Sequence, residues 1–141
     1  MFRVRSVGIN QLDQSARELY DLAGQASASA YAPYSKFQVG AAIRTERGTV
    51  FQGCNVENAS YGLTCCAERS AIFAAVAAEG GKMRVKEVAV YVEAAAASPC
   101  GACRQVIAEF GMNVRVLFSR GSVIIDTTIA ELLPDHFVPP G

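Results

Sequence analysis

The chain has 141 residues, of which 51% are hydrophobic, and this is enough to bury the core of one globular domain without disulfide bridges. Its 13 basic and 13 acidic residues give a net charge of zero, and no segment carries a run of lysine or arginine. Both features argue against a protein that binds nucleic acid. No stretch approaches the roughly 18 apolar residues of a membrane span, so we expect neither nucleic acid nor a membrane as a partner.

The first half of the chain is predicted to form one helix and a pair of strands. Apolar residues recur at helical spacing over Leu12–Ala30, with Asp13 near the start, where an acid suits the helix dipole. Pro33 follows this helix, and the residue before a proline avoids the helical region. Two strands and the turn between them come next: Phe37–Ile43, the turn at Glu46–Gly48, and Thr49–Val56.

In the second half, two predicted helices each begin at a cysteine motif. A polar loop over residues 57–62 leads to the first, which runs from Cys66 to about Glu79 and ends at Gly80. The second opens at Ser98–Pro99 and reaches about Phe110. The remaining predicted elements are strands over Val85–Val92, Val114–Phe118 and Val123–Ile125, and a short helix over Thr128–Leu133.

Helices alternate with strands along the chain, twice as strand-helix-strand units. Such alternation predicts the α/β class, with a single mixed β-sheet and helices packed on its faces. We find no repeat, linker or low-complexity tract in the sequence. One domain over residues 1–141 is therefore expected.

Three cysteines and a glutamate carry the clearest chemical signal. Cys66-Ala67-Glu68 is followed downstream by Pro99-Cys100-Gly101-Ala102-Cys103. Structural zinc sites usually have four protein ligands, whereas three ligands leave a position for water, whose pKa the metal lowers from about 15.7 to about 7. Cys-x-x-Cys alone also occurs in redox motifs and by chance, and buried, inert cysteines are the alternative. Together the motifs predict a catalytic site with one zinc ion held by Cys66, Cys100 and Cys103.

Three charged residues follow the predicted ligands. Glu68 can face a bound water without binding the metal, and the only histidine, His136, lies in the C-terminal tail, so Glu68 is the predicted proton shuttle. Its alternative role is to stabilise the helix dipole. Arg69 and Arg104 are candidates to donate to a ligand sulfur and offset the charge of three thiolates, although either could be an ordinary surface arginine.

Five cysteines are an odd number, and three of them have the spacing of metal ligands. This usage favours a reducing compartment over a secreted disulfide framework, so we expect a cytoplasmic protein. Cys54 and Cys65 receive no role from the sequence.

Cys-x-Glu followed by Pro-Cys-x-x-Cys resembles the signature of zinc-dependent deaminases. Longer segments look like the small, homotetrameric cytidine deaminases of nucleotide salvage, and these are residues 31–42, 53–61, 66–69 and 98–105. The match covers about Leu12–Phe137, which implies a deaminase-like α/β/α sandwich with that core and with the first ten residues outside it. It also implies hydrolysis of cytidine and deoxycytidine to uridine and deoxyuridine plus ammonia, by a zinc-activated water with Glu68 as proton shuttle, in pyrimidine salvage.

The resemblance further implies how a nucleoside is held. Asn55 and Glu57 match a pair that hydrogen-bonds the ribose 3′-hydroxyl. Residues two apart in an extended segment point to the same side, so both side chains can face one sugar. The alternative is a polar loop that caps the next helix.

Other substrate contacts rest on the resemblance alone. Phe37 matches a ring that lies against the base, and Phe137 matches a phenylalanine that reaches a neighbouring subunit's site; a core aromatic is the alternative for each. Ala59 and Tyr61 fall in a loop that approaches the 5′ side of the substrate from another subunit, and Ala67 belongs to the implied substrate site. The implied assembly is a homotetramer with shared sites.

Other functions remain open from the sequence. A deaminase of another aminated heterocycle, such as a blasticidin-type antibiotic or a free base, would share the zinc and glutamate machinery. A zinc-stabilised binding module would use the same cysteines but would need neither Glu68 nor an open ligand position. A nucleic-acid editor is less favoured, because the chain lacks a basic groove and interleaved aromatic residues.

Overall fold

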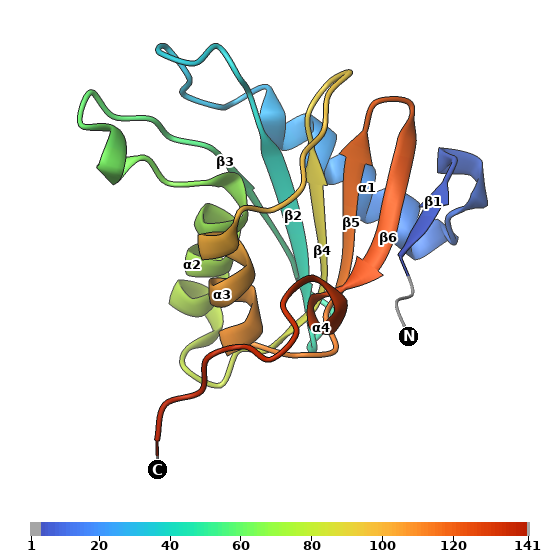
Figure 1. Ribbon diagram of the computed structural model, residues 1–141, viewed down its shortest axis with the longest axis vertical. Helices are drawn as coiled ribbons and strands as arrows, with labels where there is room; N and C mark the ends of the chain where they lie inside the picture. The colour runs from blue at the N-terminus through green and yellow to red at the C-terminus, as the bar shows by residue number, and fades with distance from the viewer. Residues whose placement is uncertain (1–3, 141) are drawn as a thin grey trace.

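The computed structural model describes residues 4–140, and one mixed, six-stranded β-sheet organises them (Figure 1). Within the sheet β4 and β5 pair in parallel, and the other neighbouring strands pair antiparallel. The prediction of a single mixed sheet is therefore confirmed. The strands lie in the order β1 (Arg5–Val7), β6 (Val123–Thr128), β5 (Arg115–Arg120), β4 (Val85–Tyr91), β2 (Gly40–Thr45) and β3 (Val50–Cys54).

Helices cover both faces of this sheet (Figure 1). They are α1 (Gln14–Ser27) on one face, α2 (Ala67–Glu79) and α3 (Gly101–Glu109) on the other, and the short α4 (Ile129–Leu132) near the end of β6. Side chains of β2 alternate between the two cores: Ala42 packs in the α1 cluster, whereas Ala41 and Ile43 pack in the cluster of α2 and α3. Among residues 4–140, no helix is long and apolar enough to span a bilayer.

The strand β2 begins later than the sequence predicts. Residues 37–39 were expected in the strand, but their backbone groups form hydrogen bonds with the side chain of Asn55 instead of with a neighbouring strand. Asn55 Oδ1 accepts from the Val39 N–H at 2.8 Å, and Asn55 Nδ2 donates to the Phe37 carbonyl at 2.7 Å. This segment therefore lies beside the sheet as an extended arm, held by a side chain rather than by strand pairing.

The β6 edge of the sheet differs from the prediction. β6 continues past the predicted end at Ile125 to Thr128 and pairs with β1, which lies in the segment before the expected family core. The polar residue that ends the predicted strand, Asp126, is buried and accepts hydrogen bonds from Arg115 at 2.9 Å and from Arg5. These long-range ion pairs allow a carboxylate inside the sheet.

Gly53 sets how closely α2 approaches the sheet. A Cβ at Gly53 would lie 2.5 Å from the amide nitrogen of Ala71 and 2.6 Å from the carbonyl oxygen of Ala67, both backbone atoms of α2. The backbone of a helix cannot move locally to relieve such a clash. We therefore expect Gly53→Ala to lower the free energy of unfolding by about 3 kcal/mol. Denaturant unfolding measures the loss. Gly81→Ala is the matched control, since a Cβ there meets nothing within 4 Å; equal stability of the two variants would contradict this packing.

Candidate metal and catalytic site

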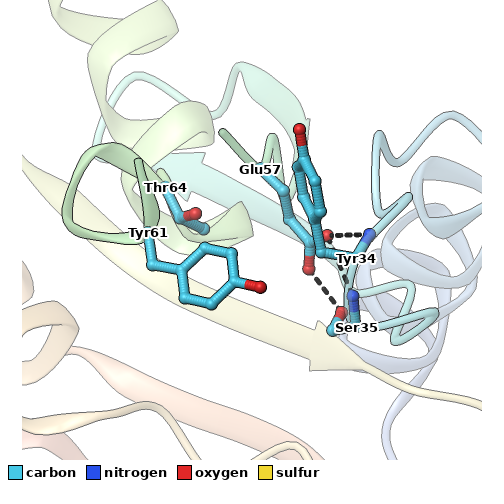
Figure 2. A pocket seen from close by; sticks show the side chains of 5 residues that line it. All are labelled: Tyr34, Ser35, Glu57, Tyr61 and Thr64. Atoms are coloured by element: carbon cyan, nitrogen blue, oxygen red, sulfur yellow. Dashed lines mark hydrogen bonds between the residues drawn. The ribbon is translucent and has the colours of Figure 1, made fainter. Parts of the chain in front are cut away.

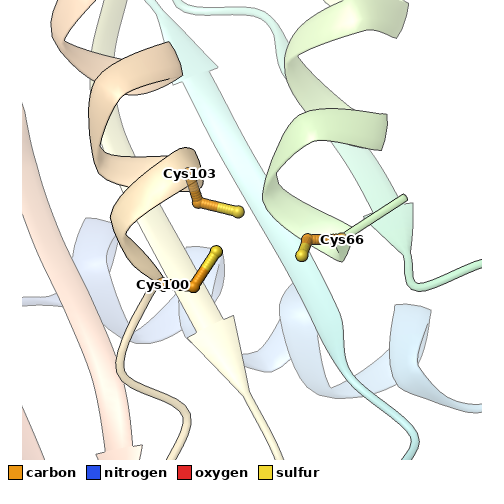
Figure 3. Close-up of side chains that lie close together, drawn as sticks. All are labelled: Cys66, Cys100 and Cys103. Atoms are coloured by element: carbon orange, nitrogen blue, oxygen red, sulfur yellow. The ribbon is translucent and has the colours of Figure 1, made fainter. Parts of the chain in front are cut away.

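Three cysteine sulfurs meet where α2 and α3 begin (Figure 3). Cys66 is the N-cap of α2, Cys100 is the N-cap of α3, and Cys103 lies in the first turn of α3. Their Sγ atoms all lie within 4.8 Å of one another. Two sulfurs bound tetrahedrally to zinc at about 2.3 Å are about 3.8 Å apart, so the cluster has the dimensions of a zinc site.

The contacts of Cys66 favour its thiolate form. Cys66 and Cys100 are N-caps with extended backbone conformations, and a helix N-terminus favours negative charge nearby. A hydrogen bond from the Cys103 thiol lowers the pKa of Cys66 to about 5; burial opposes the shift, and Arg69 assists it, donating from Nη2 to the Cys66 sulfur at 3.0 Å. The pKa of Cys103 is raised, because it supplies that bond and is buried. The position of Cys66 beside Arg69 thus favours a thiolate, the form in which cysteine binds metal.

Arg104 does not make the contact that was predicted for it. It donates to the carbonyls of Pro99 at 2.8 Å and Leu132 at 2.9 Å, and to the hydroxyl of Ser98 at 3.0 Å. Within residues 4–140, none of its hydrogen bonds reaches a sulfur. Its guanidinium instead ties the loop before Cys100 to the end of α4, because those carbonyls have no helical partner there.

A cavity of about 390 Å³ opens from the cysteine cluster. Cys66 and Cys100 line it, whereas Cys103 is fully buried, so one side of the cluster faces the cavity. The remaining lining residues are Ser35, Phe37, Val39, Asn55, Glu57, Thr64, Ala67, Glu68, Val90, Ala96, Ala97 and Ser98. The three ligand atoms thus leave an approach to the metal position from the cavity.

Glu68 lies next to the cluster without belonging to it. Its carboxyl lines the cavity, the residue is only 4% exposed, and its oxygen atoms are not among the three clustered ligand atoms. Burial raises the pKa of Glu68. A carboxyl with a raised pKa in a cleft can accept and return protons near neutral pH, as a general acid and base does.

Asn55 and Glu57 also line the cavity, but each is already hydrogen-bonded to the chain: Asn55 to the arm of residues 37–39, and Glu57 to the turn before it. Asn55 holds Phe37 and Val39, as described above, and Glu57 Oε1 accepts from the backbone N–H groups of Tyr34 at 2.9 Å and Ser35 at 3.2 Å. Neither residue caps α2, whose N-cap is Cys66. The amide retains one N–H and the carboxylate retains lone pairs, so both can still bind a ligand hydroxyl.

A smaller cavity of about 210 Å³ adjoins the first (Figure 2). It shares Ser35, Glu57 and Thr64 with the larger cavity, and its other lining residues are Tyr34 and Tyr61, whose ring centroids are 5.8 Å apart. Tyr61, a predicted substrate contact, thus lines the smaller cavity and not the larger one.

Two predicted contact residues lie elsewhere in the chain's own fold. Ala59 is exposed and lines neither cavity. Phe137 is 70% exposed and lies against α3, in a separate small cavity with Gln105 and Ala108. Neither contributes to the cavity of its own chain.

The sequence did not single out Ser35, Thr64 or Val90 as lining residues. Ser35 carries a weak signal, since a serine hydroxyl in a turn often accepts from the backbone N–H two residues on. Thr64 precedes Cys66 by two residues in an extended segment and could have been placed on the same side. The sequence around Val90 indicates only a residue of a buried strand.

Comparisons with known proteins agree with this geometry. A family model described as the cytidine and deoxycytidylate deaminase zinc-binding region matches residues 13–119. A cytidine deaminase of Sporosarcina psychrophila is 50% identical in an alignment of 117 residues that covers 80% of this chain and 84% of that protein. A blasticidin-S deaminase of Bacillus cereus is 34% identical, over 87% of this chain and 92% of that protein. The crystal structure of a cytidine deaminase from Burkholderia pseudomallei, 47% identical, aligns with a TM-score of 0.77 over 89% of this chain and 100% of that one.

Proposed function

Because the chain belongs to the cytidine and deoxycytidylate deaminase zinc-binding family, we propose that it hydrolyses cytidine and deoxycytidine to uridine and deoxyuridine with release of ammonia. The observation that carries this proposal is the three-sulfur cluster that faces a cavity beside a buried glutamate.

The three cysteines fit one zinc ion in donor type and spacing, and Cys66, Cys100 and Cys103 would hold it. Zinc, when bound, lowers the pKa of a coordinated water and so supplies a nucleophile at neutral pH. The chain's own contribution is to leave that side of the cluster open to the cavity and to offset the thiolate charge with Arg69.

Glu68 acts as the general base and general acid of the proposed reaction. Attack at C4 of cytosine requires a proton to leave the attacking water, one to reach N3, and one to reach the departing amino group. The acidic residues lining the cavity are Glu57 and Glu68, and Glu57 accepts from the backbone N–H groups of Tyr34 and Ser35. Glu68, with its raised pKa, is therefore the group that carries each proton.

The remaining contacts favour a nucleoside over a phosphorylated substrate. Asn55 and Glu57 would bind the 3′-hydroxyl, which cytidine and deoxycytidine share, and Phe37 would pack against the base. Among the described residues, none of those lining either cavity is a lysine or arginine, the usual partners of a phosphate. The carboxylate of Glu57 would repel a nearby phosphate.

The test compares cytidine, cytosine and cytidine monophosphate by the fall in ultraviolet absorbance on deamination. Purified protein of known zinc content should act on cytidine and poorly on the other two. Cytosine lacks the sugar, so polar groups of the site stay unpaired. The phosphate of cytidine monophosphate would meet the Glu57 carboxylate in cavities that no lysine or arginine lines among the described residues. No turnover of cytidine by zinc-loaded protein would overturn the proposal. Turnover of blasticidin S alone would favour the activity that the Bacillus cereus relative's name describes.

Arg69→Gln tests the charge balance of the cluster. Without the guanidinium, the three thiolates keep more negative charge on the metal, so the acid limb of the pH profile for kcat/KM should move to higher pH. We expect activity at pH 7 to fall by about 10-fold to 100-fold. Arg104→Gln is the matched control, because Arg104 donates to carbonyls and a hydroxyl instead. An Arg69→Gln enzyme with the wild-type rate and pH profile would refute this role.

We also propose the homotetramer with shared sites that the resemblance implies. Large exposed apolar residues occur in two neighbouring pairs, Tyr61 with Leu63 and Phe137 with Val138, and contiguous exposed apolar surface is typical of interaction sites. Phe137 lies away from its own cavity and is free to reach that of a neighbour, together with Ala59 and Tyr61. Sedimentation should show a tetramer, and a stable, active monomer would contradict the shared site. A cytoplasmic role in pyrimidine salvage completes the proposal.

A further inference from the structure

One serine links the groups that the proposed function assigns to the sugar and the base. The hydroxyl of Ser35 donates to Oε2 of Glu57 and accepts from the backbone N–H of Phe37 at 3.0 Å. A serine hydroxyl has a single proton, so these two contacts fix its direction toward Glu57. Ser35 lines both cavities, and Figure 2 shows its side chain beside the Glu57 carboxylate.

The carboxylate of Glu57 is held by donors from two consecutive residues. The N–H groups of Tyr34 and Ser35 reach Oε1, and the Ser35 hydroxyl reaches Oε2. The Ser35 hydroxyl is the main cause of a lowered pKa for Glu57, which keeps this side chain ionised. An ionised carboxylate only accepts hydrogen bonds, so a sugar hydroxyl that meets it must donate.

The same hydroxyl also stabilises an uncommon backbone conformation. Lys36 has a φ of 60°, in the left-handed region that residues other than glycine seldom adopt. The bond from the Phe37 N–H to the Ser35 hydroxyl spans Lys36 and closes this turn. Strain of this kind persists only where surrounding contacts enforce it, and here it places the Phe37 ring at the cavity.

We propose that Ser35 is a positioning residue for the ribose 3′-hydroxyl: it holds Glu57 in the orientation that accepts from this hydroxyl and ties that carboxylate to the turn carrying Phe37. The inference rests on the proposed function and adds to it a residue that acts through Glu57. Of the three donors to Glu57, the Ser35 hydroxyl is the one that a side-chain substitution removes while leaving both backbone donors in place.

The test uses three substrates that differ at the sugar: cytidine, 2′-deoxycytidine and 3′-deoxycytidine. In Ser35→Ala, kcat/KM should fall about tenfold for the first two, since a hydrogen bond to a charged group is lost. It should fall by a smaller factor, about threefold or less, for 3′-deoxycytidine, which has no 3′-hydroxyl to misplace and loses only the support of the turn that carries Phe37. Ser35→Thr keeps the hydroxyl and should restore the wild-type pattern. Ser27→Ala is the matched control: its hydroxyl donates to the Gly24 carbonyl at 2.6 Å, away from both cavities.

Equal losses on all three substrates would show that the hydroxyl serves only to fold the turn, and would overturn the inference. An unchanged kcat/KM in Ser35→Ala would do the same. In both cases the wild type still deaminates cytidine, so the proposed function would stand. A zinc-loaded wild type that leaves cytidine intact would overturn the proposed function and this inference with it.

Discussion

Glu68→Gln is expected to lower turnover of cytidine by about 10³-fold to 10⁴-fold while zinc remains bound. The amide has nearly the shape of the carboxyl but cannot take up and return a proton, and a positioned general acid and base contributes up to about that factor. Because Glu68 lies outside the three-sulfur cluster, its loss should leave one zinc per chain. Turnover measured together with metal content separates the two effects.

The same variant should be at least as stable as the wild type at neutral pH. Burial raises the pKa of Glu68, so its ionised form opposes folding as the pH rises above the ordinary range of a carboxyl, and glutamine removes that cost. Glu79→Gln, at the other end of α2, is the matched control and should keep full activity, because glutamine retains an acceptor for the Thr45 hydroxyl. A Glu68→Gln enzyme with near wild-type turnover would point to a zinc-stabilised binding module or to another proton carrier.

Cys103→Ser should abolish zinc binding and, with it, activity. Cys103 is the buried member of the cluster, and its removal leaves two sulfurs for a metal that takes at least three protein ligands in such sites. Metal binding also stabilises the folded state, so the thermal unfolding temperature should fall along with the zinc content. We expect less than about 0.1 zinc per chain after dialysis, since serine is a poor ligand for this ion.

Cys65→Ser is the matched control for this prediction. Cys65 is adjacent to Cys66 in sequence, but its sulfur is not in the cluster and accepts a hydrogen bond from the Ser70 hydroxyl at 3.6 Å. This variant should keep one zinc and near wild-type activity. Zinc retained by Cys103→Ser, or lost from Cys65→Ser, would show that the ligand set differs from the three clustered cysteines.

The local features of the site could be predicted from the sequence. The polar loop before Cys66, Gly80 and the Ser98–Pro99 pair mark helix boundaries, so the positions of Cys66 and Cys100 at two helix starts were predicted correctly. The alternation of helices with strands likewise predicted the mixed sheet. These signals depend on residues close together in the chain.

The errors arose where distant residues decide local structure. The strand predicted from Phe37 begins later because the Asn55 side chain forms hydrogen bonds with backbone groups of Phe37 and Val39. β6 runs past Ile125 because Arg115 and Arg5 satisfy a buried carboxylate. Arg104 does not donate to the sulfurs because its guanidinium donates to the carbonyls of Pro99 and Leu132. Neither spacing nor composition reports such contacts.

The central claim is that the three-cysteine cluster and Glu68 form one catalytic zinc site. The most direct measurement is a zinc titration of metal-free protein with cytidine present, in which ammonia release is followed at each step. We expect activity to rise in proportion to bound zinc and to reach its maximum at one zinc per chain, with Glu68→Gln binding the same zinc and releasing little ammonia. Full activity in the metal-free protein, or no activity at one zinc per chain, would contradict the account.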